Sequence, residues 1–600
     1  RPDERRDVHV VPAGVAHPDR EGIVYDYFDV LARLWTTGYY QPQTDWCASR
    51  GMTFTAHLCG EEQMMELIHG LNTDFFQSLS GVGEPGVDVI WRQVYFGCTT
   101  DFPRLGGSAA NVWGKPRAMT ESFAVFGSGT TYEQMKYVSD YQLVRSINDF
   151  FLMMWNYDCE GWRRLHHPPD LSTDSTLYPY LRLYSEYIGR ASTVMATGTP
   201  IADVAVYYPT RSAWLGDGAS LDAAHSMGRR LLERQRDFEW IDDKGLVDCC
   251  HPSAGGMRNL SGTLHRVFVI PPCDVISAAA ADRVREFVQA GGALVCYGRL
   301  PSRFGGYQPE PTTLNGLLRR MAAAPGEWVG EGQGRAVFVA DETAALAAIE
   351  SAGPPRFGLR EPISSLRLAG RDHGTFQVWF ATNEGEEPIE TELELAFVPA
   401  VEEWDAETGA CRPVAPIADG AGGCRVPLRL CPRASRVFVF GLGRPAQPVA
   451  AGPAHELLRL DGEWDWIFVH DGNAVHRGPL ALWSELGRPE YSGDVDYAQS
   501  FELASVPSGR VVLDLGRVRY MARVTLNGAA LPARLWPPYA VDVTGLLRAG
   551  RNDLVVRVTN TPANRFFARP GDRAAAEARG WFEGTYVGTY EAFEADSIPS

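Results

Sequence analysis

The sequence predicts a multidomain protein of the α/β plus all-β class, in which two α/β domains precede two β-domains. Strand-like and helix-like runs alternate through the first half of the chain, which is typical of parallel sheets. From about residue 360, apolar and polar residues alternate with a period of two, which indicates half-buried strands of antiparallel sheets. The length of 600 residues is also too great for one hydrophobic core, because domains usually contain about 100–200 residues.

Residues 1–198 are expected to form the C-terminal half of a TIM-type catalytic barrel, a partial (β/α)8 barrel. Four short apolar runs, each separated from the next by a helical pattern, are predicted as strands at 52–59, 87–92, 116–122 and 149–155. Each run ends in polar residues, as barrel strands do at the face that holds active sites. Because four units make half a barrel, we expect that the chain is part of a longer protein and is truncated at both ends.

Residues 199–355 are expected to form a second α/β domain with helices on both faces of its sheet. Its clearest predicted strands are the apolar runs at 202–208, 266–272 and 293–297. The all-β half is predicted to divide at a linker rich in Pro, Ala and Gly, near residues 443–454. We expect a β-sandwich over 356–447 and a jelly roll over 448–600.

The composition excludes some classes of function. The net charge of −18 leaves no basic footprint for a nucleic acid, and the absence of an apolar run of about 18 residues argues against a membrane span. The 11 cysteines form no CxxC pair, so we expect unpaired thiols. Unpaired thiols favour the bacterial cytoplasm, with a periplasmic location as the alternative if a signal precedes the chain. The oligomeric state is not predicted.

Several short motifs carry a family resemblance. Residues 118–123 (AMTESF) resemble the Glu-Ser-Phe strand end of glycoside hydrolase family 106, the α-L-rhamnosidases. The motifs at 513–516, 524–528, 536–539 and 550–552 resemble the galactose-binding-type jelly roll of that family and of family 2 enzymes. Residues 200–350 are similar to the flavodoxin-like domain of family 42 β-galactosidases. The resemblance implies an exo-acting, inverting hydrolase of a terminal sugar in plant or microbial glycans. It also implies association with calcium, whose ligands we do not assign from the sequence.

Glycoside hydrolysis needs two carboxyl groups beside the scissile bond, and two candidates stand at predicted strand ends. Glu121 ends a buried strand and is our candidate for the general base, the role that the resemblance implies; capping of the next turn is the structural alternative. Glu61 follows the strand at 52–59 and is the candidate acid, but a carboxylate at a helix N-terminus is the more ordinary interpretation. In the resembled family the acid lies on an earlier strand, so we expect it outside this chain. Loss of an acid costs about 10²–10⁴ in rate.

The remaining candidates are substrate-binding residues near the same strand ends. Trp155 is expected to act as an aromatic platform for a sugar ring. The resembled family usually has a histidine near this position, where this chain has Trp155 and Asn156. His57 is as well explained as a core histidine. The full set is His57, Asp88, Arg92, Trp155, Asn156 and Asp158.

Two alternative functions are also compatible with the sequence. A retaining, β-galactosidase-like hydrolase would hold its two carboxyl groups only about 5 Å apart, clearly closer than an inverting enzyme does. A protein of another class, a non-catalytic carbohydrate-binding scaffold, would result if the barrel has lost its acid.

Overall fold

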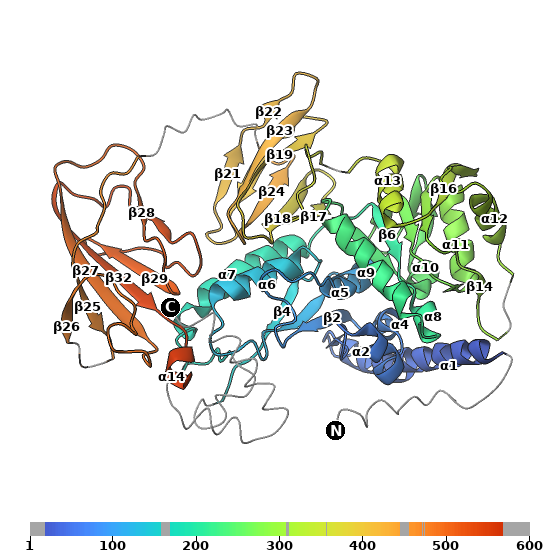
Figure 1. Cartoon of the computed structure of the whole chain (residues 1–600), viewed down its shortest axis with the longest axis horizontal. Coiled ribbons are helices and arrows are strands. Elements are labelled where there is room, and N and C mark those ends of the chain that lie inside the picture. The colour runs from blue at the N-terminus through green and yellow to red at the C-terminus, as the bar shows by residue number, and fades with distance from the viewer. Residues whose placement is uncertain are drawn as a thin grey trace.

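The computed structural model describes residues 19–157, 169–307, 311–355, 357–443, 455–470, 472 and 474–567. The predicted combination of α/β and all-β architecture is confirmed, because parallel sheets with helices occupy the first part of the chain and antiparallel sheets the second. Figure 1 shows the antiparallel parts and the second α/β part arranged around a central layer that contains α6 (Tyr132–Leu143) and α7 (Tyr178–Met195). Among the described residues no helix is both long and apolar enough to cross a bilayer.

The first sheet has four parallel strands in chain order, β1 (Thr55–Ala56), β2 (Glu84–Val89), β3 (Met119–Ser122) and β4 (Asp149–Leu152). All four strands lie within the predicted strand regions or overlap them, and most are shorter. The helical elements around them are α1 (Arg20–Leu34), η2 (Trp35–Tyr40), α2 (Gln41–Ala48), α3 (Met64–Glu66), η3 (Leu67–Leu71), α4 (Phe75–Ser80), α5 (Pro103–Val112), α6 and α7.

Local sequence explains where these helices begin and break. The helical pattern between the first two predicted strands is interrupted because Thr73 adopts a positive φ of 66° and Asp74 then caps α4 by accepting a hydrogen bond from Gln77 N. A capping box formed by Thr131 and Gln134 starts α6. This cap sets the start of the helix that follows β3.

The second parallel sheet has helices on both faces. Its strands run in the order β15 (Val329–Glu331), β16 (Gly334–Val339), β13 (Ala293–Tyr297), β11 (Val267–Ile270), β6 (Val204–Tyr207) and β7 (Phe238–Ile241), with β15 antiparallel. Apolar residues of α9 (Gly218–Leu232) and α13 (Glu342–Ala352) belong to one core cluster. Those of α10 (Asp243–Cys249), α11 (Ala278–Gln289) and α12 (Asn315–Ala323) belong to another, on the opposite face.

The smaller elements of this region are α8 (Thr210–Trp214), β8 (His251–Ser253), β9 (Gly256–Arg258), β10 (Leu264–His265), β12 (Val275–Ile276) and β14 (Arg303–Phe304). Strand β5 (Thr199–Ile201) opens the region in sequence, but it pairs with β17 (Leu366–Asp372) of the following β part. This pairing ties the two parts together.

The β parts have separate cores. The first packs β21 (Cys411–Val414), β20 (Val401–Trp404), β24 (Ser435–Phe440), β18 (Gln377–Asn383), β17 and β5 against β19 (Ile389–Leu395), β23 (Cys424–Leu430) and β22 (Ile417–Ala418). The second contains β26 (Val475–Gly478), β25 (Trp464–Phe468), β27 (Asp494–Leu503), β32 (Gly550–Thr559), β29 (Met521–Leu526) and β30 (Ala529–Ala530), with the pair β28 (Val512–Asp514) and β31 (Ala540–Asp542), and α14 (Ala563–Phe567) after it.

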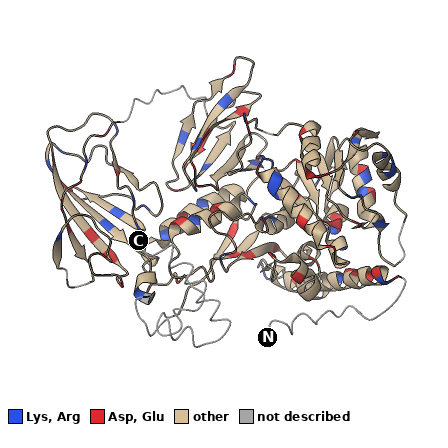
Figure 2. Cartoon of the chain, in the orientation of Figure 1, with Lys and Arg blue, Asp and Glu red and all other residues tan. Residues whose placement is uncertain are grey.

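Buried polar contacts join the parts to the four-stranded unit. Arg145, at the end of α6, pairs with Glu384 of the first β part at 2.6 Å. The Tyr180 hydroxyl of α7 lies 2.6 Å from Thr559 Oγ1 of the second β part. Figure 2 shows that basic and acidic residues are interspersed over these parts. The four-stranded unit therefore sits within an assembly of packed domains.

A glycine pair in two helices gives a prediction about packing. A Cβ on Gly107 of α5 would lie 2.1 Å from the Arg145 carbonyl oxygen, whereas a Cβ on Gly189 of α7 would meet no atom within 4 Å. We expect Gly107→Ala to lower the free energy of unfolding by about 1–3 kcal/mol. The control Gly189→Ala is expected to raise it by about 0.5–1 kcal/mol. Thermal unfolding of both variants measures these two changes in stability. Equal shifts of the unfolding midpoint would show that the close packing at Gly107 is relaxed in solution.

Candidate active site

Glu121 is the central residue of the candidate site, near the carboxyl end of β3. Its neighbour Ser122 points toward the helical layer, since Gln142 of α6 donates a hydrogen bond to Ser122 Oγ at 3.0 Å. Side chains alternate along a strand, so Glu121 points to the opposite face of the sheet. Its side chain is 30% exposed there. This carboxylate therefore lies on the partly exposed face of the sheet, opposite α6, which we call the open face.

Strand register brings Asp88 beside Glu121, because these residues are partners across β2 and β3. The partner of Glu121 on β4 is Phe151, which is 45% exposed. His57 follows β1 directly, next to β2. Figure 2 shows acidic residues on the strands of this sheet. The carboxyl ends of three neighbouring strands thus supply the polar residues of the site.

His57 lies between two carboxylates. Its Nε2 is 3.3 Å from Glu121 Oε2, and its Nδ1 is 2.7 Å from the Leu58 carbonyl oxygen and 3.4 Å from Glu61 Oε1. Because all of these atoms are acceptors, both ring nitrogens must carry hydrogen. Burial works to lower the pKa of His57, but the hydrogen bonds to Glu121 and Glu61, with the charges of Glu61 and Asp88, raise it to about 11. The ring is an imidazolium at neutral pH.

Glu61 and Asp88 form a buried carboxyl pair behind this histidine. Glu61 is fully buried and accepts a hydrogen bond from Leu58 N at 2.8 Å, whereas its Oε2 and Asp88 Oδ1 have no hydrogen-bond partner. Burial and the charge of Glu61 raise the pKa of Asp88 to about 8. At neutral pH Asp88 is therefore mostly protonated. Since Glu61 has no exposed surface, it is badly placed to protonate a leaving group.

The same three residues are the group to test as calcium ligands. His57, Glu61 and Asp88 offer ligand atoms within 4.8 Å of one another. Calcium takes six to eight oxygen ligands, but this group provides two carboxylates and a ring whose nitrogens both face acceptors. These three residues do not fit a calcium site. Protonation of Asp88 reduces the repulsion between the two carboxyl groups.

The loops after β2 and β3 are bound to each other beside Glu121. Trp91 N donates to the Ala124 carbonyl at 3.0 Å, and Phe123 N donates to the Val89 carbonyl at 3.1 Å. Trp91, Phe123 and the β-branched Val125 have φ values of 54°, 82° and 63°. Such values are costly for these residues and are found where the surroundings hold the chain firmly. No residue type in the sequence signals this feature.

The other candidate residues from the sequence lie around Glu121 and His57, except for one that is outside the residues that the structure describes. Arg92 is half-buried in the loop after β2. At the end of β4, Trp155 is 58% exposed and makes an edge contact with the Tyr178 ring, whose centroid is 5.5 Å away. Asn156 is buried, and its backbone N donates to Asp170 Oδ1 at 3.3 Å. Asp158 lies outside the described residues.

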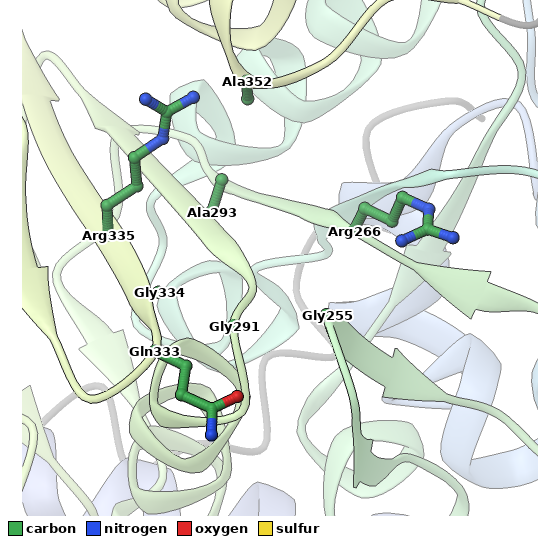
Figure 3. A pocket seen from close by; sticks show the side chains of 8 residues that line it. All are labelled: Gly255, Arg266, Gly291, Ala293, Gln333, Gly334, Arg335 and Ala352. Atoms are coloured by element: carbon green, nitrogen blue, oxygen red, sulfur yellow. The ribbon is translucent and has the colours of Figure 1, made fainter.

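A cavity of about 270 Å³ lies elsewhere, at the amino ends of strands in the second parallel sheet. It is lined by Gly255, Arg266, Gly291, Ala293, Gln333, Gly334, Arg335 and Ala352. Figure 3 shows the side chains of Arg266, Gln333 and Arg335 extending in different directions. Because its polar groups do not converge, and because ligands of such sheets bind at the carboxyl ends, this cavity is not the candidate site.

Comparison with known families adds independent information. A family model described as alpha-L-rhamnosidase, Glyco_hydro_106, matches residues 15–416, which is more than half of the chain. A protein of Formosa agariphila named "Putative beta-glucuronidase" is 26% identical over 217 residues, which cover 34% of this chain and 18% of that protein.

Two solved structures resemble the fold. A rhamnosidase from Novosphingobium sp. PP1Y has a TM-score of 0.76 at 19% identity, over 92% of this chain and 54% of that one. A catalytic mutant of Gan42B, a GH42 beta-galactosidase from G. stearothermophilus, has a TM-score of 0.51 at 12% identity, over 72% and 70% of the two chains. The chain spans about half the length of the rhamnosidase and about a fifth of the curated relative.

Proposed function

The chain belongs to the alpha-L-rhamnosidase family Glyco_hydro_106, and from this premise we propose that it hydrolyses terminal α-L-rhamnosides with Glu121 as general base. The observation that carries the proposal is the position of Glu121 on the open face of β3, in contact with the His57 imidazolium. A base must be ionised at the working pH and must reach the attacking water. A half-buried carboxylate beside a fixed positive charge meets both requirements.

The proposed reaction is a single displacement with inversion. Glu121 takes a proton from water as the water oxygen bonds to the anomeric carbon, and the glycosidic oxygen leaves with a proton from a general acid. Glu61 does not suit the acid, because it is fully buried and already bonded to Leu58 N. We therefore propose that the acid comes from outside the described residues.

Substrate contacts are proposed for the residues around Glu121. The exposed face of Trp155 suits the apolar C–H face of a sugar ring, in an aromatic site braced by Tyr178. Arg92 and Asn156 suit sugar hydroxyl groups, and Asp158 keeps the same proposed role. Asp88 is assigned instead to the buried pair with Glu61.

The domain assignments are part of the proposal. We propose that the four-stranded sheet is half of a (β/α)8 barrel within residues 1–198, and that residues 199–355 form a flavodoxin-like domain. Residues 356–447 are proposed as a β-sandwich and 448–600 as a galactose-binding-type jelly roll. The parallel order of β1 to β4 and the two-faced helical cover of the second sheet support the first two assignments.

The test is hydrolysis of a panel of activated aryl glycosides by the chain. A nitrophenolate leaves without prior protonation, so the assay reports on the base even where no acid assists. We expect turnover of the α-L-rhamnoside, with NMR showing that the sugar first released has the inverted configuration. Turnover of a β-galactoside with retention would instead favour the retaining enzyme. Sugar binding without any turnover would favour a carbohydrate-binding scaffold.

A further inference from the structure

His57 takes no part in the bond changes described above, yet it links the proposed base to the buried carboxyl pair. We propose that His57 is a positioning residue, which stays an imidazolium and thereby keeps the Glu121 carboxylate ionised and directed to the open face of the sheet. This inference rests on the proposed role of Glu121 as general base.

The first step of the argument is the hydrogen-bond pattern of the ring. Nδ1 meets only oxygen acceptors, the Leu58 carbonyl at 2.7 Å and Glu61 Oε1 at 3.4 Å. Nε2 meets Glu121 Oε2 at 3.3 Å. A neutral imidazole would turn a lone pair toward one of these oxygens, which is repulsive. The geometry therefore requires two N–H groups.

The second step concerns the charge around the ring. A largely buried histidine ordinarily loses its proton, because burial disfavours the charged form. Here carboxyl groups face the ring from three elements: Glu61 from its own loop, Asp88 from β2 and Glu121 from β3. Glu62 and the Cys59 thiol lie near the same carboxyl groups. This acidic surrounding holds the positive charge in place.

The third step is the effect on Glu121. A hydrogen bond between an imidazolium and a carboxylate is short-range, directional and stronger than a neutral one, so it orients the carboxyl plane. It also favours the ionised form that a general base needs. In the proposed reaction Glu121 gains the proton that water loses and later returns it to solvent. His57 keeps both of its protons throughout, which distinguishes positioning from proton relay.

The experiment is NMR of the chain labelled with ¹⁵N-histidine. The chain has 13 histidines, and the signals that disappear in His57→Gln are those of His57. We expect both ring nitrogens of His57 to remain protonated up to about pH 9, whereas ordinary histidines titrate near pH 6.5. Glu121→Gln should move the His57 transition to lower pH. The matched control Glu62→Gln, on an exposed neighbour of Glu61, should leave it nearly unchanged.

Two results would overturn the proposal. One is a His57 ring that is neutral at about pH 7 or titrates near 6.5 like an unperturbed histidine. The other is a change in the His57 signals on addition of calcium chloride, because it would show that the group of His57, Glu61 and Asp88 binds the cation. Neither measurement depends on turnover. If the imidazolium signature is found but Glu121→Gln does not slow hydrolysis, the ion pair stands and the proposed function fails.

Kinetics give a second measurement where the chain turns over an aryl rhamnoside. His57→Gln retains one donor toward Glu121, so it should lower kcat less than His57→Ala does, with little change of KM. If His57 had only a structural role, the two variants would have the same kcat, provided that circular dichroism shows both to be folded. Equal kcat in the two folded variants would contradict positioning.

Discussion

Replacing Glu121 by glutamine is expected to lower kcat for an aryl α-L-rhamnoside by about 10²–10⁴, the usual contribution of a general base. Glutamine keeps the size of the side chain and a carbonyl oxygen for His57, but it cannot take a proton from water. KM should change little, because the amide can still contact substrate. The fold should be preserved, because glutamine has nearly the same size and shape as the glutamate it replaces.

The measurement is steady-state kinetics of Glu121→Gln, with Glu62→Gln as the control. Glu62 is exposed, lies in the same acidic group and loses the same charge when replaced. We expect its kcat to stay near that of the unaltered chain. Equal activity of the unaltered chain, Glu121→Gln and Glu62→Gln would exclude Glu121 as the base. A parallel loss in both variants would point to the overall charge of the site.

The second large effect is expected in stability, at Arg104 of α5. This fully buried guanidinium contacts Asp237 at 2.9 Å and Glu239 at 3.3 Å, beside β7, and it also donates to the Phe238 carbonyl and to Ser146 Oγ. Arg104→Met would remove the main partner of the buried Asp237 carboxyl group and one partner of Glu239, which also accepts a hydrogen bond from Asn111 Nδ2 at 2.7 Å. Breaking a buried pair from one side costs about 3–5 kcal/mol. For a unit of this size the midpoint of thermal unfolding should fall on the order of 10 °C.

The control for Arg104 is Arg117→Met, which removes an ion pair that is largely exposed. Arg117 lies 3.0 Å from Asp149, and its side chain is 59% exposed. Surface pairs contribute about 0–1 kcal/mol, so the midpoint should move by no more than about 4 °C. Because the chain has several domains, the transition is best followed by both calorimetry and circular dichroism. Similar shifts in the two variants would mean that the Arg104 contacts are not maintained in solution.

Burial also gives Asp237 a pH response that accompanies this prediction. Desolvation raises its pKa to about 7 although the Arg104 charge lowers it. A carboxyl group whose pKa is higher in the folded state holds its proton longer there, so its contribution to stability falls as pH rises from about 4 toward 7. Without Arg104 the pKa should rise further. The destabilisation by Arg104→Met should therefore be smaller at about pH 5 than at about pH 8.

Sequence patterns determined much of the backbone architecture. The alternation of apolar runs and helical patterns predicted the four parallel strands. The polar end of the run at 116–122, together with the resemblance of residues 118–123 to family 106, singled out Glu121. These features are local: periodicity and caps act within a few residues, and strand ends face one edge of any parallel sheet.

Only the tertiary structure decided what the neighbouring acidic residues do. From the sequence, Glu61 was a candidate acid, with a carboxylate at a helix N-terminus as the more ordinary interpretation. Packing buries it near Asp88, and their distance depends on how β1 and β2 align. The charge of His57 depends on Glu61 and Glu121, which are separated by 60 positions in the chain, and the pairing of β5 with β17 joins segments still further apart. Desolvation and hydrogen-bond distance are properties of the packed molecule, and no short-range pattern encodes them.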